Sequence, residues 1–301
     1  MKFGFGTQLW LRNNHYENFY RMLVELALEG LDGFECAPGF LADWYGGNPK
    51  ELRKILDMFG LEVSSYYHYG EYFDKDGREA SNKEQKRRAN LMAELGYENV
   101  LLDGGRKVPG LDARQFDDYI KQIAETANQL GAYAKSLGLT LSWHQHWGSV
   151  FEVQAPFHRL MELTDPELVG FCCDVGQLAL GDFDTLETVE RYASQGRIRF
   201  MHYKDLTCAG RPEGRLWDGY DVPSDLGAYN VDSKYRWVEL GRGCVDFAGV
   251  TEILLKYGYD GWLVDDFDFT GYEPRASVRA CKNFINLALG IKTARDIKEG
   301  R

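Results

Sequence analysis

Two histidines, His144 and His146, lie two positions apart in the segment LTLSWHQHWGSVFE. They stand at the end of an apolar run, just before a glycine, in a chain that has six histidines in all. A histidine changes charge near neutral pH, so it can bind a divalent metal or transfer a proton. Residues i and i+2 of a strand point to the same side, and the two imidazoles are therefore expected to point together.

Other ionisable residues stand at the ends of other apolar runs. They are Glu35, His68, Asp103, Asp174, His202, Lys204, Asp265, Asp266 and Asp268. Carboxylates and histidines that come from different strands and meet in one space suit a divalent metal such as Mn²⁺, Zn²⁺, Co²⁺ or Fe²⁺. A single histidine at a strand end is more often a structural, hydrogen-bonded residue. It is the coincidence across several strands that predicts a metal site.

The elements that must position these residues alternate along the chain. Eight short apolar runs are each followed by a stretch of helical period. The runs are residues 3–10, 32–38, 61–69, 98–105, 139–146, 168–176, 198–206 and 261–269. Such an alternation predicts parallel βαβ units, and eight of them predict an α/β fold that closes into a (β/α)8 TIM barrel. An open, doubly wound sheet is the alternative, but no G-x-G-x-x-G segment follows the first run. We expect residues 1–301 to form one barrel domain.

Residues 207–237 interrupt the seventh unit with a segment rich in Gly, Pro, Asp and aromatic residues. Because it follows the seventh strand, it is expected at the carboxyl end of the barrel, where barrel active sites are built. Its aromatic residues, Trp217 among them, could stack on a sugar ring. Packing of these side chains within the loop is the alternative.

Composition and charge exclude several classes of protein. The net charge of −11 argues against nucleic acid as a partner, since that binding depends on clustered Lys and Arg. No apolar run approaches the roughly 18 residues of a membrane span. The first residues also lack the apolar stretch of a signal peptide. We expect a cytoplasmic protein that binds no membrane and whose six cysteines are free thiols.

Four segments, in this order, resemble those of a known family. They are WHQHWGSVFE, CCDVGQLALGDFD, IRFMHYKDL and WVELGRGCVDFAGVTEILLKYGYDGWLVDDFD. They are similar to the H-x-H-x-G-[ST]-x-x-[EQ], C-x-D-x-G-H, H-x-H-x-K-D and E-L-G-x-G-x-V-D-F segments of the inosose dehydratase-like branch. That branch belongs to the sugar phosphate isomerase/epimerase group of the xylose isomerase-like TIM barrel superfamily. The resemblance covers nearly the whole chain and is strongest from Leu139 onward.

The resemblance implies a metal site and its ligands. In the superfamily a carboxylate on strand five, an Asp on six, a His on seven and a Glu on eight hold the metal. This implies Asp174 and His202 as ligands, with Asp266 in place of the last Glu. At strand five, Glu152 matches the motif and is the expected carboxylate ligand, while His144 at the strand end is the alternative. We expect Mn²⁺, with Co²⁺, Zn²⁺, Fe²⁺ or Mg²⁺ as alternatives, and a homo-oligomer.

The resemblance also implies the chemistry and the substrate. A metal that polarises a carbonyl group allows a base to remove a proton from the neighbouring carbon of a carbohydrate. We expect His144, His146 and Lys204 to be catalytic. We expect substrate contacts from Glu35, His68, Gln177 (where the family has a His) and Trp217.

The paired histidines favour elimination, because elimination needs an acid as well as a base. The expected enzyme is thus a dehydratase or lyase acting on an inosose or a 3-keto glycoside. A sugar isomerase or epimerase using the same proton abstraction is the first alternative. A non-catalytic sugar-binding protein with a decayed metal site is the second. The acidic charge disfavours a DNA-repair endonuclease of the same superfamily.

Overall fold

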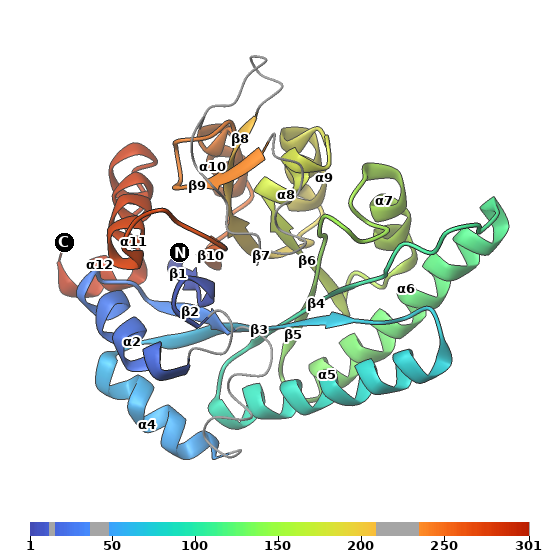
Figure 1. The fold of residues 1–301 in the computed structure, drawn as a ribbon, viewed down its shortest axis with the longest axis horizontal. Coiled ribbons are helices and arrows are strands. Elements are labelled where there is room, and N and C mark those ends of the chain that lie inside the picture. The colour runs from blue at the N-terminus through green and yellow to red at the C-terminus, as the bar shows by residue number, and fades with distance from the viewer. Residues whose placement is uncertain (12–15, 37–47, 209–234, 301) are drawn as a thin grey trace.

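Eight parallel strands form a closed barrel in the order β1-β10-β7-β6-β5-β4-β3-β2, as Figure 1 shows. The computed structural model describes residues 1–11, 16–36, 48–208 and 235–300. The prediction of a TIM barrel is thus confirmed. The strands are β1 (Lys2–Gly6), β2 (Gly33–Cys36), β3 (Glu62–Gly70), β4 (Asn99–Gly104), β5 (Thr140–His144), β6 (Val169–Asp174), β7 (Ile198–Tyr203) and β10 (Trp262–Asp265).

Helices lie around the outside of this barrel (Figure 1). The principal ones are α2 (Phe19–Leu28), α4 (Pro49–Phe59), α5 (Lys75–Leu95), α6 (Ala113–Ser136), α7 (Gln154–Leu163), α8 (Val175–Leu180), α9 (Thr185–Ser194), α10 (Phe247–Lys256) and α11 (Pro274–Asn283). Side chains at their N-termini explain where several begin. Asn48, for example, accepts a hydrogen bond from the backbone N–H of Glu51, with Pro49 in the first turn.

The structure differs from the sequence expectation at some element boundaries. The first strand ends at Gly6, and Gln8–Leu11 form the short helix α1. Helical periodicity in the sequence predicts a helix from residue 82, but α5 begins at Lys75, because the Asp74 side chain caps it by accepting the backbone N–H of Gly77. The helix predicted after the eighth strand, residues 274–290, consists of α11 and a π-helical turn, η4 (Phe284–Ala288). The helix α12 (Ala294–Glu299), which follows it, was not predicted.

The insertion after the seventh strand begins and ends in an antiparallel ribbon. This ribbon consists of β8 (Asp205–Cys208) and β9 (Tyr235–Val238), with Leu206 opposite Trp237. The Asp205 carboxylate accepts backbone N–H groups from the segment that leads to α10, at 2.8 Å from Gly243 and 3.0 Å from Gly241. The ribbon base is therefore fixed to the barrel. Residues 209–234, including Trp217, lie outside the described residues.

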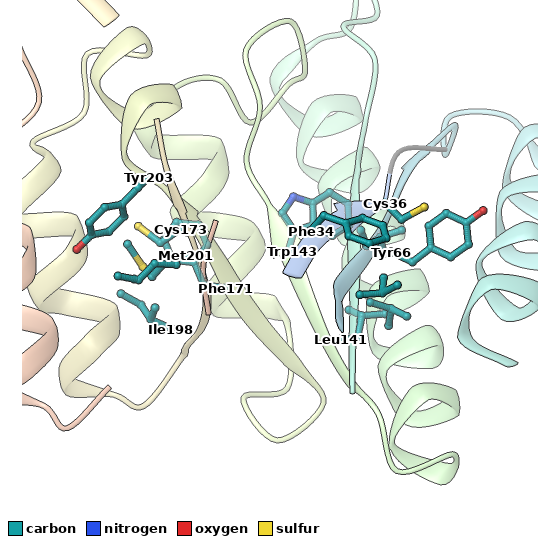
Figure 2. Close-up of a cluster of buried hydrophobic side chains, with 14 of the residues drawn as sticks. Phe34, Cys36, Tyr66, Leu141, Trp143, Phe171, Cys173, Ile198, Met201 and Tyr203 are labelled. Atoms are coloured by element: carbon teal, nitrogen blue, oxygen red, sulfur yellow. The ribbon is translucent and has the colours of Figure 1, made fainter. Parts of the chain in front are cut away.

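Buried apolar side chains form two separate cores, as strand alternation requires. The core inside the barrel consists of Leu101, Cys172, Phe200, Trp262 and Val264. The larger core lies between the strands and the helices, and Figure 2 shows a part of it with Phe34, Trp143 and Phe171. Cys172 belongs to the inner core and Cys173 to the outer one, so adjacent residues do point to opposite faces.

The inner core closes one end of the barrel, so that polar strand ends can meet at the other. The Trp262 ring fits there because the nearby strands β1 and β2 carry glycine at the positions that contact it. A Cβ on Gly33 would lie 2.9 Å from Cη2 of Trp262 and 2.1 Å from the carbonyl oxygen of Glu62. A Cβ on Gly4 would lie 3.2 Å from its nearest neighbour.

The prediction of free cysteines is confirmed for Cys36, Cys172, Cys173 and Cys281. It is wrong for Cys244, which is disulfide-bonded. Among the described helices, none is long and apolar enough to cross a membrane.

The substitution Gly33→Ala tests how tightly the inner core is packed. We expect a loss of about 1–3 kcal/mol in the free energy of unfolding, because the added methyl group overlaps the neighbouring strand and Trp262. Gly4→Ala is the matched control and should cost less, since its closest contact is longer. Urea denaturation measures both values. Equal midpoints for the two variants would show that the inner core is loosely packed near β2.

Candidate active site

The inward-facing residues at the carboxyl ends of the strands are polar. On β6 the inner face runs from Cys172 to Asp174, and on β7 it runs from Phe200 to His202 and then Lys204. Asp174 pairs directly with His202 in the strand register. Alternation therefore places these ionisable side chains directly above the inner core.

Three of these side chains form a cluster that fits a divalent metal. In His144, Asp174 and His202, one ligand atom from each residue lies within 4.8 Å of the others, and all three residues are buried. Oδ2 of Asp174 is 3.3 Å from Nε2 of His144 and 3.5 Å from Nδ1 of His202. Two imidazole nitrogens and a carboxylate oxygen are a donor set that Zn²⁺, Mn²⁺ and Fe²⁺ accept. We refer to these residues as the His-Asp-His cluster.

Asp174 is held in place by its own chain. Its Oδ1 accepts the backbone N–H of Gln177 at 2.8 Å and so caps α8. Helix α8 can lie close to the backbone of Lys204 because Gly176 has no side chain. A Cβ at this position would lie 2.6 Å from the Lys204 carbonyl oxygen. Burial opposes ionisation, but hydrogen bonds from His144 and His202 hold the pKa of Asp174 below its usual range. Oδ2 is thus charged and directed at the two histidines.

His202 is oriented by a carboxylate on the opposite side of its ring. Its Nε2 lies 2.9 Å from Oε2 of Glu35, and that oxygen also accepts the hydroxyl of Ser65. Nδ1 of His202 is left facing Oδ2 of Asp174, at 3.5 Å. A carboxylate on the second nitrogen is how proteins commonly fix a metal-binding histidine. The geometry therefore makes Glu35 a positioning residue for His202.

Lys204 is a buried cation beside the cluster. Its Nζ is 2.8 Å from Oδ2 of Asp266, also bonds Asp268, and lies 4.4 Å from the ring centre of Trp237. Burial would lower the pKa of Lys204, but Asp266 and Asp268 raise it well above its ordinary value. Lys204 therefore remains an ammonium group and cannot act as a base at neutral pH.

Asp266 lies at the border of the cluster. Its Oδ2 is 4.0 Å from Nδ1 of His202 but only 2.8 Å from Nζ of Lys204. Its Oδ1 lies 3.4 Å from the side-chain amide of Gln8, a contact that no sequence pattern predicts. The short side chain of Asp, compared with the Glu of the resembling family, leaves this carboxylate paired with lysine.

His146 stands next to the cluster, with its ring centre 5.5 Å from that of His144. Its Nδ1 lies 2.5 Å from the carbonyl oxygen of Trp147, which can only accept a hydrogen bond, so Nδ1 carries the proton. The lone pair of the neutral ring is then on Nε2. Burial lowers the pKa of His146, which keeps the ring neutral at neutral pH. A neutral imidazole of this kind is suited to accept a proton.

Tyr67 and Asp103 form a second wall of the site. The Tyr67 hydroxyl donates to Oδ2 of the buried Asp103 at 2.7 Å, and its ring meets that of His144 edge-on, with centres 5.8 Å apart. The position of Asp103 at the end of an apolar run made it a candidate, whereas Tyr67 was not predicted. The spacing of two residues between Ser65 and Tyr67 could have revealed Tyr67, because residues two apart on β3 point to the same, inner face of the barrel.

His68 is one residue out of that register and faces away from the site. Its imidazole lies near Arg88, a residue of helix α5. Burial, with Arg88 adding to the effect, lowers the pKa of His68 to about 4. The expected contact of His68 with substrate stays a prediction.

The remaining predicted residues lie at different distances from the cluster. Glu152 bonds Lys107 and the backbone N–H of Gly148, the latter at 3.0 Å, and is not part of the cluster. Of the two strand-five alternatives, the structure thus brings His144 to Asp174. Gln177 accepts the N–H of Trp147 at 3.0 Å, and its buried Nε2 has no partner in the described part of the chain.

Comparisons with known proteins agree with this architecture. A family model described as xylose isomerase-like TIM barrel matches residues 23–270. An inosose dehydratase of Lacticaseibacillus casei is 28% identical over 255 residues, covering 82% of this chain and 80% of that protein. An inosose dehydratase of Salmonella typhimurium is 29% identical over 259 residues, covering 82% and 81%.

Solved structures share the fold at lower identity. The probable 3-DHS dehydratase AsbF from Bacillus anthracis has a TM-score of 0.74 at 13% identity, covering 95% of this chain and 99% of that one. The IOLI protein with a bound zinc atom has a TM-score of 0.73 at 14% identity, covering 96% and 98%. The 3-keto-D-glucoside 4-epimerase YcjR from E. coli has a TM-score of 0.70 at 17% identity, covering 95% and 99%.

Metal content tests which side chains are ligands. We expect about one divalent metal per chain in the wild type and at least a tenfold loss of affinity in Asp174→Asn and His144→Ala, because the first removes the negative charge of a ligand and the second removes an imidazole donor. Glu152→Gln is the control and should keep its metal, since Glu152 bonds Lys107 and Gly148 instead. Elemental analysis after dialysis measures all four proteins. Loss of metal in Glu152→Gln, with retention in His144→Ala, would contradict the arrangement.

The environment of His68 makes stability depend on pH. The unfolded chain protonates His68 near its ordinary pKa of 6.5, whereas the folded protein does so near 4. The folded state therefore binds fewer protons, and this stability is complete above pH 6.5 and is lost as the pH falls toward 4. From pH 7 to pH 5 the wild type should lose roughly 2 kcal/mol more than His68→Gln in urea denaturation. Equal losses in both proteins would show that His68 is not held neutral by the fold.

Proposed function

Because the chain belongs to the xylose isomerase-like TIM barrel family, we propose that it is a metal-dependent enzyme acting on a keto-sugar or keto-cyclitol. The reaction is removal of a proton next to the ketone, followed by elimination of the substituent one carbon further on. The observation that carries this proposal is the His-Asp-His cluster lying beside the neutral His146. Relatives named inosose dehydratase support a carbohydrate substrate and the loss of water.

Three side chains would hold the metal: His144, Asp174 and His202. A divalent metal, when bound there, would act as a Lewis acid on the substrate carbonyl. The IOLI structure, which has a similar fold, contains a bound zinc atom and so supports a divalent metal in this chain. We propose Mn²⁺ for this chain because a mixed set of nitrogen and oxygen donors suits it. Three protein ligands would leave coordination positions open for substrate oxygens.

His146 is the proposed base. Because Nδ1 donates its proton to the Trp147 carbonyl oxygen, the other ring nitrogen, Nε2, carries the lone pair that can accept a proton. Its place beside His144 would put a substrate held at the cluster within reach. His144 itself lies against Asp174, so its role would be to bind rather than to move the proton.

Lys204 would stabilise negative charge that develops on the substrate. Its ammonium group is buried and fixed by Asp266 and Asp268, so little rearrangement is needed during the reaction. The Nε2 donor of Gln177, buried and without a partner in the described residues, would bind a substrate hydroxyl or carbonyl oxygen. Gln cannot titrate near neutral pH, so Gln177 would orient the substrate rather than transfer a proton.

Tyr67 is the proposed acid for the leaving oxygen. Asp103 accepts the Tyr67 hydroxyl proton at 2.7 Å, and that proton would pass to the leaving oxygen. The Tyr67 ring meets the ring of His144 edge-on. An epimerase of the same fold would need the same base but no leaving-group acid. The hydroxyl of Tyr67 thus favours elimination over epimerisation, which is the second candidate function and is supported by the epimerase among the similar structures.

Deuterium exchange can separate the two proton transfers. With 2-keto-myo-inositol in D₂O, the metal-loaded wild type should exchange the hydrogen next to the ketone and release water. Tyr67→Phe should lose elimination by about 10²–10⁴-fold but still exchange that hydrogen, because the base is intact. NMR measures the exchange, and absorbance of the unsaturated product measures the elimination.

A neighbouring tyrosine gives the control. Tyr66 is on the same strand but packs on the outer side of the barrel, as Figure 2 shows, so Tyr66→Phe should retain both steps. A chelator should abolish both steps in every variant, and added metal should restore them. Exchange and elimination that persist without metal would refute the metal-dependent mechanism. Unchanged elimination in Tyr67→Phe would refute the role of Tyr67 alone.

A further inference from the structure

A tight turn, residues 146–149, follows β5 and contains the proposed base. Gly148 in this turn has a φ of 90°, a conformation that residues with a side chain rarely adopt. The turn belongs to the segment that resembles H-x-H-x-G-[ST]-x-x-[EQ], which ends at Glu152. Glu152 bonds Lys107 and the backbone N–H of Gly148 rather than joining the His-Asp-His cluster, so its carboxylate has another role here.

The peptide group between His146 and Trp147 is bonded at both ends. Its carbonyl oxygen, that of His146, accepts the Ser149 hydroxyl at 2.8 Å and the Ser149 backbone N–H at 3.3 Å. Its N–H, that of Trp147, donates to Oε1 of Gln177 at 3.0 Å. Ser149 and Gln177 are each only 1% exposed, so bulk water does not compete for these bonds. Because a peptide group is planar, binding both of its ends fixes its orientation.

The following peptide group, between Trp147 and Gly148, is held in the same way. Its carbonyl oxygen accepts Nδ1 of His146 at 2.5 Å, and its N–H donates to Oε2 of Glu152 at 3.0 Å. The glutamate at the end of the motif therefore fixes the peptide group whose oxygen binds the imidazole.

Gln177 connects this turn to the His-Asp-His cluster. Its backbone N–H donates to Oδ1 of Asp174 at 2.8 Å, while its side-chain Oε1 holds the N–H of Trp147. Residues joined by hydrogen bonds thus lead from Asp174 through Gln177 and Trp147 to the ring of His146. Gln177 is therefore the residue that fixes the turn relative to the proposed metal site.

The orientation of the Trp147 carbonyl group decides which nitrogen of His146 can act as a base. A carbonyl oxygen only accepts, so its place at Nδ1 keeps the proton there and leaves the lone pair on Nε2. In a neutral imidazole, the hydrogen bond at one nitrogen decides which nitrogen carries the proton. If the turn rotated this oxygen away, a part of the molecules would carry the proton on Nε2, which could then accept no other.

We propose that Gln177 is a positioning residue for the base: through the Trp147 peptide group it holds His146 in the form with the proton on Nδ1. The inference rests on the proposed function, in which His146 is the base, and adds how the segment that holds the metal ligand Asp174 prepares that base. It is separate from the proposed substrate contact of Gln177, because that contact uses Nε2 and this one uses Oε1.

NMR of protein with ¹⁵N-labelled histidine tests this arrangement without substrate. In the zinc-loaded wild type at about pH 8, where a histidine of ordinary pKa is neutral, we expect His146 to show a protonated Nδ1 and an unprotonated Nε2. The variant His146→Gln assigns these signals. Gln177→Met keeps the volume but loses the acceptor, so both signals should shift toward those of the other tautomer. Gln177→Glu should restore the wild-type signals, because a carboxyl group still accepts the Trp147 N–H.

Gln85→Met is the matched control. Gln85 is also 1% exposed, and neither atom of its side-chain amide bonds any of the described residues, so the same change there should leave the His146 signals unaltered. Unaltered signals in Gln177→Met, or an equal shift in Gln85→Met, would overturn the inference. So would a Gln177→Glu protein that behaves like Gln177→Met. Gln177→Asn, whose shorter side chain does not reach Trp147, repeats the test if the methionine variant does not fold.

Turnover separates this inference from the proposed function. With 2-keto-myo-inositol, kcat for deuterium exchange should fall about tenfold to a hundredfold in Gln177→Met, because a small displacement of a catalytic group costs rate on this scale. The fall should be smaller in Gln177→Glu. Shifted His146 signals in Gln177→Met, with no exchange by the wild type, would overturn the proposed function and leave the positioning role standing. Exchange by the wild type, with unshifted His146 signals in Gln177→Met, would overturn the positioning role and leave the function standing.

Discussion

The two oxygens of the Asp174 carboxylate are bound differently, and the site depends on this difference. Oδ1 caps α8 through the backbone N–H of Gln177, so the fold itself fixes the carboxylate. Oδ2 is thereby directed toward His144 and His202 from the two neighbouring strands. The hydrogen bonds that lower the pKa of Asp174 also keep a negative charge at the centre of the barrel. A cation is the natural complement of that charge and of the two imidazoles.

The charged groups around this centre are paired with one another. Glu35 orients His202 by bonding its Nε2. Asp266 and Asp268 enclose the ammonium group of Lys204. The buried ammonium group of Lys204 thus has partners of opposite charge, as the cost of desolvation requires. The side that Tyr67, Asp103 and His146 occupy carries the groups suited to proton transfer. Binding, charge stabilisation and proton transfer are therefore assigned to different strands of one barrel.

The sequence predicted the barrel and most of this centre because both depend on short periods. Alternating apolar runs reveal the strands, and the polar residue that ends each inner face reveals the site. Two details depended on more than the period. His68 and Tyr67 are adjacent, and only the three-dimensional register shows that Tyr67 faces inward. Glu152 matches a family motif, but the loop after β5 turns it toward Lys107, a residue 45 positions earlier that no local pattern connects to it.

X-ray absorption spectroscopy of the zinc-loaded protein would test the central claim most directly. We expect two imidazole nitrogens and at least one carboxylate oxygen around the metal, because His144, His202 and Asp174 converge there. A coordination shell with a single imidazole and three carboxylates would instead mean that Glu152 and Asp266 reach the metal. That result would contradict the arrangement derived from the cap of α8 and from the pairing of Asp266 with Lys204.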